Sequence, residues 1–136
     1  MKKFLSMLAL SILIVTSLTA AAPTPNTTFT LIQGLPSTMN VGDTYTVIVQ
    51  VDSDQEFTSV QALPSFQFAG KGVVAVQGGD RAGRGTSVTL EITFKAKNST
   101  AAFPGGGVAP VYVVVGVRYP GGYVAAQEYL FNVTVP

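Results

Sequence analysis

The chain has 136 residues, which is enough for one domain and too few for two ordinary ones. Hydrophobic residues make up 47% of it and charged residues only 11%, a balance too apolar for a disordered chain. Eight Lys and Arg, including Lys2 and Lys3 near the N-terminus, stand against seven Asp and Glu, so no basic surface exists that would hold nucleic acid. Cysteine and histidine are absent, which excludes a disulfide framework, a thiolate metal site and catalysis by an imidazole base.

The N-terminal segment has the layout of a secretory signal peptide, which we assign to residues 1–22. Lys2 and Lys3 form a basic start, Phe4–Leu18 is an uncharged apolar run, and Ala20–Ala22 supplies small residues for cleavage. The alternative is a retained membrane anchor, because the apolar run approaches the length that spans a bilayer. With cleavage we expect a secreted or extracellular cell-surface protein, without a membrane span in the mature chain.

Residues 23–33 combine a linker with a first strand. Pro23 and Pro25 keep the linker extended, and Thr27–Gln33 is a β-prone strip that begins directly after it. Gly34, Leu35 and Pro36 then break the strand, and residues 34–136 form the remaining domain. Alternating apolar and polar residues predict six further strands there: Thr44–Val51, Phe57–Leu63, Gly72–Gln77, Thr86–Lys97, Val111–Tyr119 and Tyr123–Val135.

The stretch Val111–Tyr119 is apolar on both of its alternating faces. Such a strand is typical of a central position with both faces covered. Pro120, Gly121 and Gly122 provide a turn, so the last two strands form a hairpin. No window shows helical periodicity, and about seven short strands in one domain indicate an all-β, immunoglobulin-like antiparallel sandwich.

Several motifs resemble a known class of domain. They are GLPSTMNVGDTYTVIVQVDS, FTSVQALPSF and TSVTLEITFKAK, followed by the valine-rich penultimate strand. Together they are similar to the Ig-like repeats of archaeal and bacterial surface proteins, of the CARDB and S-layer-associated type. The resemblance implies a β-sandwich at a cell surface, and it brings no catalytic residues.

The sequence predicts a non-enzymatic protein that needs no cofactor. Glu91 and Glu128 are the carboxylates that could flank a sugar, but each is isolated on its own strand. Gly78–Gly85 is rich in glycine, yet it lacks the Lys-Ser/Thr and the helix of a phosphate-binding loop. We read it as a turn.

One weak metal candidate remains in the predicted polar loop after Val51. Asp52, Asp54 and Glu56 could gather hard oxygen ligands around calcium, although the spacing and glycine of an EF-hand are missing. The alternative is a solvated acidic turn. We therefore expect no metal site apart from this weak candidate.

Three of the four asparagines, Asn26, Asn98 and Asn132, lie in N-x-S/T sequons without proline. We expect N-glycosylation at these positions. Three tyrosines offer rings that could stack on carbohydrate or pack within the sheet and at subunit contacts: Tyr112, Tyr119 and Tyr123.

Two functional hypotheses follow from these features. In the first, the protein is a structural subunit of an extracellular filament or cell-surface assembly, a homopolymer or a partner of other surface proteins. Its N-terminal strand, with Phe29, Leu31 and Ile32, would then complete the sheet of a neighbour by donor-strand exchange. The alternative places Thr27–Gln33 as the first strand of its own domain. The second hypothesis is a monomeric binding module for carbohydrate, such as a polysaccharide, or for protein.

Overall fold

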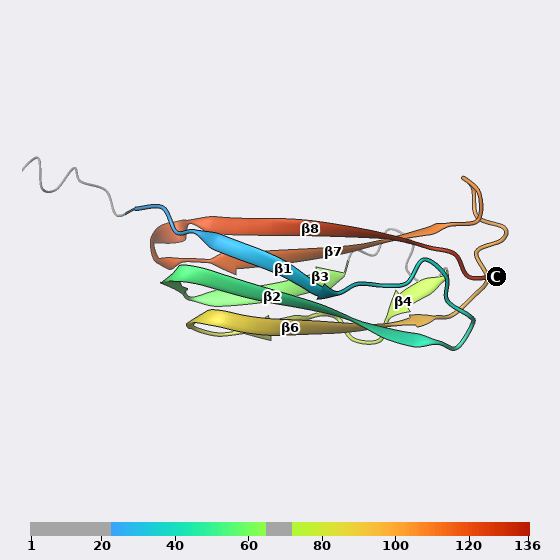
Figure 1. The fold of residues 1–136 in the computed structure, drawn as a ribbon, viewed down its shortest axis with the longest axis horizontal. Coiled ribbons are helices and arrows are strands. Elements are labelled where there is room, and N and C mark those ends of the chain that lie inside the picture. The colour runs from blue at the N-terminus through green and yellow to red at the C-terminus, as the bar shows by residue number, and fades with distance from the viewer. Residues whose placement is uncertain (1–22, 65–71) are drawn as a thin grey trace, which may run out of the picture.

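The computed structural model describes residues 23–64 and 72–136 and contains two four-stranded sheets packed face to face (Figure 1). All strand pairs are antiparallel. The first sheet has the order β1 (Thr27–Gln33), β2 (Thr44–Phe57), β6 (Gly85–Ala96), β4 (Val73–Ala75). The second has the order β5 (Asp80–Ala82), β3 (Ser59–Pro64), β7 (Ala109–Arg118), β8 (Val124–Val133). The predicted all-β, immunoglobulin-like sandwich is confirmed.

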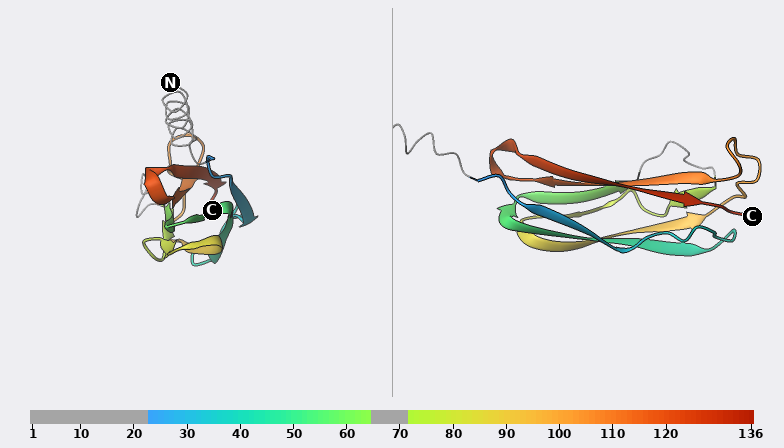
Figure 2. Two further views of the ribbon diagram at one scale, coloured as in Figure 1. Left: turned by 90° about the vertical axis from the view of Figure 1, so that its left-hand side faces the viewer. Right: turned by 45° about the horizontal axis from the view of Figure 1, so that its top comes forward.

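The core lies between the two sheets, and the end-on view in Figure 2 shows these two layers. Side chains of a strand alternate between its faces, so every second residue of the long strands points inward. The buried residues of β2, β6 and β7 that follow this rule include Val47, Val49, Val51, Leu90, Ile92, Phe94, Val111, Val113, Val115 and Val117. Burying each such side chain contributes about 1.5–3 kcal/mol, and this layer is what holds the domain together.

Strand β7 is central in its sheet, as predicted, but only one of its faces is covered. It pairs with β3 on one side and β8 on the other. Its inward valines are buried, whereas Val114 and Arg118 on the other face are exposed. The prediction of two covered faces was wrong, because an apolar composition does not by itself bring a third layer onto the sheet.

Two further differences concern segments expected to be loops. Strand β2 continues through the predicted polar loop Asp52–Glu56 to Phe57, because Asp52 and Ser53 find ladder partners in Thr28 and Thr27. Part of the segment Gly78–Gly85, which was expected to be a turn, forms strand β5 and pairs with β3. The described part of the chain therefore has eight strands instead of the seven expected.

The segment between β1 and β2 crosses from the first sheet to the second and returns. After Gln33 it leaves the first sheet, and Thr38 forms a parallel bridge with Thr134, beside the end of β8. Met39 is 1% exposed, and its amide donates to the Thr134 carbonyl at 3.0 Å. A tight turn at Gly42, whose φ of 96° suits glycine, leads back into β2.

Some sequence predictions fall outside the described residues. The signal peptide assigned to residues 1–22 lies there, and so does the end of the motif FTSVQALPSF, residues 65 and 66. Within the described ranges, no helix is long and apolar enough to cross a membrane.

Candidate assembly site at strand β1

Strand β1 is the least buried of the long strands. Among the described strands of six or more residues, it alone contributes no fully buried residue. Phe29 is half-buried and packs against the core, whereas Leu31 is 39% and Ile32 53% exposed. The three residues predicted as subunit contacts therefore lie on a strand whose packing depends mainly on a single side chain.

The ladder with β2 is the main attachment of β1. The register runs from Thr27 opposite Ser53 to Leu31 opposite Val49, and it shifts between Leu31 and Gln33. The other side of β1 has no ladder partner in the described part of the chain, since β1 ends the sheet order. An open strand edge of this kind can pair with another chain.

A group of three hydroxyls, which we call the tyrosine clasp, fixes the start of β1. The Tyr119 hydroxyl lies 2.6 Å from Thr27 Oγ1 and donates to Ser53 Oγ at 2.8 Å. Tyr119 is 4% exposed, so its phenol group needs these partners. The clasp links β1, β2 and the end of β7. The sequence left open whether the Tyr119 ring stacks on carbohydrate or packs within the sheet, and the hydroxyl partners of Tyr119 were missed because they lie far away in the chain.

The linker before β1 follows the end of β2. The Asn26 amide donates to Asp54 Oδ1 at 2.8 Å, and Gln55 Nε2 donates to the Pro23 carbonyl at 2.7 Å. These are exposed contacts, and each contributes about 1 kcal/mol or less. They guide the chain into β1 without anchoring it firmly.

Behind β1, the chain passes close to β8 at Gly34. A Cβ at this position would lie 2.7 Å from a ring carbon of Phe131, so only glycine fits without displacing that ring. Phe131 and Tyr129 are partly buried and belong to the core margin on β8. Burial raises the pKa of Tyr129 above its usual value. The flank between β1 and β8 is thus apolar and only partly covered.

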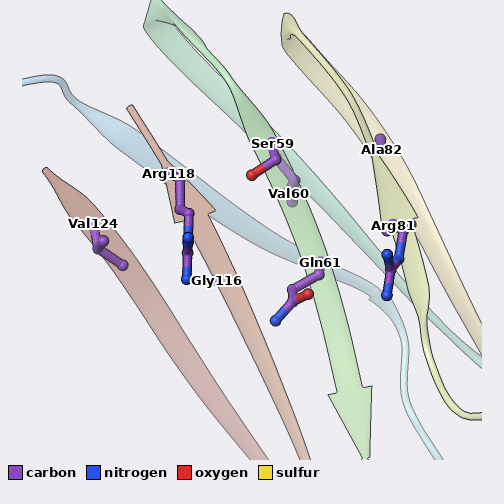
Figure 3. A pocket seen from close by; sticks show the side chains of 8 residues that line it. All are labelled: Ser59, Val60, Gln61, Arg81, Ala82, Gly116, Arg118 and Val124. Carbon is purple, nitrogen blue, oxygen red and sulfur yellow. The ribbon is translucent and has the colours of Figure 1, made fainter. Parts of the chain in front are cut away.

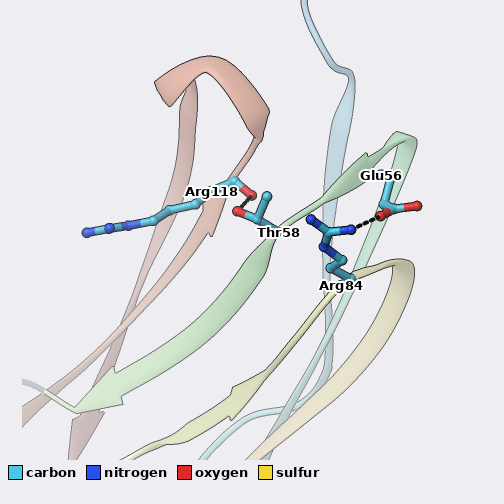
Figure 4. A network of polar contacts seen from close by, with 4 residues as sticks. All are labelled: Glu56, Thr58, Arg84 and Arg118. Carbon is cyan, nitrogen blue, oxygen red and sulfur yellow. Dashed lines mark hydrogen bonds and ion pairs between the residues drawn. The ribbon is translucent and has the colours of Figure 1, made fainter.

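The three carboxylates of the weak calcium candidate have separate partners. Asp52 Oδ1 accepts from Ser87 Oγ at 2.7 Å, while Asp54 accepts from the Asn26 amide. Glu56 lies 3.9 Å from the Arg84 guanidinium in an exposed ion pair (Figure 4). Among the described residues, no group of three or more carboxylates is placed to share one metal ion. The structure does not bring this trio together.

All three sequon asparagines are exposed: Asn26, Asn98 and Asn132. The hydroxyl-bearing residues of the sequons differ, however. Thr28 is exposed and Thr134 half-buried, but Thr100 is 0% exposed. The Thr100 hydroxyl bonds to the Gly107 carbonyl and to the backbone of Val135, so it serves the fold.

Of the tyrosines considered for carbohydrate stacking, Tyr119 is buried in the clasp and Tyr112 is half-buried. Tyr123 is 44% exposed, and its ring centroid lies 5.8 Å from that of Tyr119. The three rings do not form one stacking surface, because Tyr112 and Tyr123 lie at opposite ends of the β7–β8 hairpin.

The sequence matches no family model and no curated protein. Several solved structures are similar to it, among them the following two. One is the native conformation of E. coli alpha-2-macroglobulin, with 19% identity and a TM-score of 0.46, covering 85% of this chain and 7% of that one. The other is the SrpA adhesin from Streptococcus sanguinis, with 12% identity and a TM-score of 0.49, covering 85% of this chain and 60% of that one. The chain therefore spans less than two thirds of either, and the fold assignment rests on its own two sheets.

Proposed function

We propose that the protein is a secreted, N-glycosylated and non-catalytic subunit of an extracellular filament or cell-surface assembly, joined by exchange of β1 between copies. The observation that carries the proposal is the contrast between the length of β1 and its burial. Six of its seven residues pair along β2, yet none of the seven is fully buried. Releasing such a strand leaves the core between β2, β6, β3 and β7 in place.

The segment after β1 supports the proposal, because it would serve as a hinge with a firm anchor behind it. Gly34, Leu35 and Pro36 follow β1 directly, and the anchor begins at the next residue. Thr134 donates to the Ser37 carbonyl at 2.8 Å, and Met39 is buried in the core. Residues before the hinge can swing out while those after it stay attached to β8.

Exchange would reproduce the contacts that β1 makes within its own domain. A neighbour's β1 would pair with the vacated edge of β2 and place its Phe29 against the same core margin. If each copy donates its strand to one neighbour and accepts a strand from another, the head-to-tail contact is heterologous and need not close on itself, whereas reciprocal exchange between two copies would close as a dimer. Growth of a fibre follows from the head-to-tail geometry, as in donor-strand complementation.

Secretion, surface location and glycosylation are supported by the leader sequence and by the exposure of Asn26, Asn98 and Asn132. The resemblance to CARDB and S-layer-associated repeats agrees with that location. The second candidate function is a monomeric extracellular module that binds carbohydrate or protein. It is favoured by one feature, the arginine-lined hollow described in the next subsection.

A cysteine pair tests the exchange directly, because the chain has no cysteine of its own. Thr30 and Gln50 face each other across the β1–β2 ladder, and Thr30 is exposed. In the double variant Thr30→Cys, Gln50→Cys, exchanged strands would form disulfides between copies. We expect oxidised assemblies to run as a covalent ladder in non-reducing denaturing gels.

The control is the single variant Thr30→Cys, which gives no ladder beyond a dimer. Oxidised double variant that runs only as a monomer, at concentrations where surface material is filamentous, would overturn exchange of β1. A peptide of residues 24–33 provides a second measurement. It should bind protein lacking residues 23–33, and Phe29→Glu in the peptide should abolish binding while Thr30→Glu should not, because Thr30 points outward.

A further inference from the structure

The outer face of the second sheet contains a hollow of about 420 Å³, on a different sheet from β1 (Figure 3). Its volume falls in the range of about 300–1,000 Å³ that is usual for small-molecule sites. Residues from four neighbouring strands line it: Ser59, Val60 and Gln61 of β3, Arg81 and Ala82 of β5, Gly116 and Arg118 of β7, and Val124 of β8.

Gly116 creates the floor of this hollow. Gly116 pairs with Gln61 on one side and with Ala126 on the other. Because it has no side chain, it leaves a gap in the row of side chains that runs across the sheet. A Cβ there would meet nothing within 4 Å, and Gly116 is not among the glycines with positive φ. Glycine within a strand costs about 0.5–1 kcal/mol relative to alanine, and no local contact explains it here. Such glycines often mark a place where a ligand approaches the sheet.

Two arginines flank the floor without an ion-pair partner among the described residues. Arg81 and Arg118 are exposed, and the ion pair that the described part of the chain contains is Arg84–Glu56. Strand spacing of about 4.8 Å and a rise of about 3.3 Å per residue place their Cα atoms roughly 12 Å apart. The long side chains can therefore reach a common ligand from two sides.

The backbone at Arg118 is held while its side chain is left to solvent. The Arg118 carbonyl accepts from the Thr58 amide at 2.8 Å and from Thr58 Oγ1 at 3.1 Å. In Figure 4 the guanidinium extends away from these contacts. Because the Arg118 backbone is held in place and its planar guanidinium has no ion-pair partner among the described residues, the guanidinium is suited to bidentate binding of a carboxylate.

The remaining lining residues match a sugar better than a peptide. Ser59 and Gln61 offer a hydroxyl and an amide for sugar hydroxyls, and Val124, 55% exposed, offers an apolar surface for a ring. β3 and β7, the two central strands beneath the hollow, are paired on both sides, so a peptide could add as a strand only at the sheet edges β5 and β8. Over the centre of the hollow, recognition would come from side chains.

We propose that this hollow binds a carboxylate-bearing saccharide, such as a uronic acid unit of an acidic polysaccharide. The Arg118 and Arg81 guanidiniums would hold the carboxylate, and Ser59 and Gln61 would bond the hydroxyls. The neighbouring Glu128, two residues beyond Ala126 on β8, disfavours anions on that side and confines the carboxylate to the arginine end.

The test is titration of the mature, ¹⁵N-labelled protein with sodium glucuronate, with glucose as the neutral match and sodium sulfate as the anion match, at constant ionic strength. We expect glucuronate to shift the Gly116 and Arg118 amides saturably. Arg118→Gln should weaken binding at least about tenfold, since it removes a charge-assisted pair. Arg84→Gln, an arginine outside the hollow, should leave it unchanged.

Gly116→Val separates loss of the site from loss of the fold. Valine fills the hollow, and its β-branched side chain favours a strand, so the melting temperature should not fall while glucuronate binding is lost. Retained binding in Gly116→Val, or equal shifts with glucose or sulfate, would overturn the proposal. Tighter binding of oligoglutamate than of oligoglucuronate would overturn it in favour of an acidic peptide. The covalent ladder of the β1 cysteine pair is independent of these outcomes.

Discussion

At the scale of single residues, Thr100 belongs to a predicted sequon and is at the same time a buried contact of the fold. A glycosylating enzyme reads the sequon Asn98-Ser99-Thr100 through its hydroxyl, yet in the folded chain that hydroxyl is bonded to Gly107 and Val135. Asn26 differs, because Thr28 of its sequon is exposed. Under the proposed glycosylation, the order of folding and modification would therefore decide which asparagines carry glycans.

We expect purified oligosaccharyltransferase to modify Asn26 in folded, unglycosylated protein and to leave Asn98 bare. In protein unfolded with urea and diluted into the reaction, both positions should be modified. Glycopeptide mass spectrometry measures the occupancy of each site. Equal modification of Asn98 in both samples would contradict the structural role of Thr100.

Tyr129 gives the protein a pH dependence in the alkaline range. Burial raises the pKa of its phenol above the usual value of about 10, so the fold favours the neutral form. Its contribution to stability is fully present below about pH 10 and is lost as the pH rises through the folded-state pKa. We expect the free energy of unfolding to fall less between pH 9 and 11.5 in Tyr129→Phe than in the wild type. Urea unfolding at both pH values measures this difference, and an equal fall in the two proteins would contradict it.

At the scale of elements, β1 is retained by a ladder, by Phe29 and by the tyrosine clasp. Each of these interactions contributes only modestly to stability. The clasp is the one that can be abolished by removing a single atom, the hydroxyl oxygen of Tyr119. Tyr119→Phe keeps the buried ring but leaves Thr27 and Ser53 without their shared partner. Losing these bonds costs about 1–2 kcal/mol of local stability.

We expect amide exchange in Thr28–Leu31 to accelerate about 5- to 30-fold in Tyr119→Phe, the factor that corresponds to about 1–2 kcal/mol of opening free energy. Exchange in β6 and β7 should stay unchanged, because their core is intact. Tyr123→Phe is the matched control, since it removes a nearby exposed phenol. Uniform acceleration across all strands would show that the clasp supports the whole fold rather than β1.

At the scale of the whole molecule, the sandwich is uneven. The long inner strands seal the core, whereas the flank of β1 and β8 buries only Val133 completely. The outer face of the second sheet leaves Leu63, Val114 and Leu130 exposed around the row that Gly116 interrupts. If both proposals hold, β1 would join the protein to its neighbours and the hollow would bind a ligand, through separate surfaces of the molecule.

Local alternation predicted much of this architecture. The bounds of β1 and the buried face of β7 follow from a period of two, which depends only on neighbouring residues. The exposure of Asn132 follows in the same way, because it lies between the half-buried Phe131 and the buried Val133. The three sequons are likewise legible from sequence alone.

Only the tertiary structure decided the features that depend on distant partners. β2 continues through Asp52 because β1 returns beside it, and β5 exists because Gln61 faces Arg81 across a ladder. The clasp joins Thr27 to Tyr119. The hollow forms where Gly116 of β7 lies between Gln61 of β3 and Ala126 of β8. The alternation of residues in the sequence shows which face of a strand is apolar. Whether another strand or solvent lies against that face depends on tertiary packing.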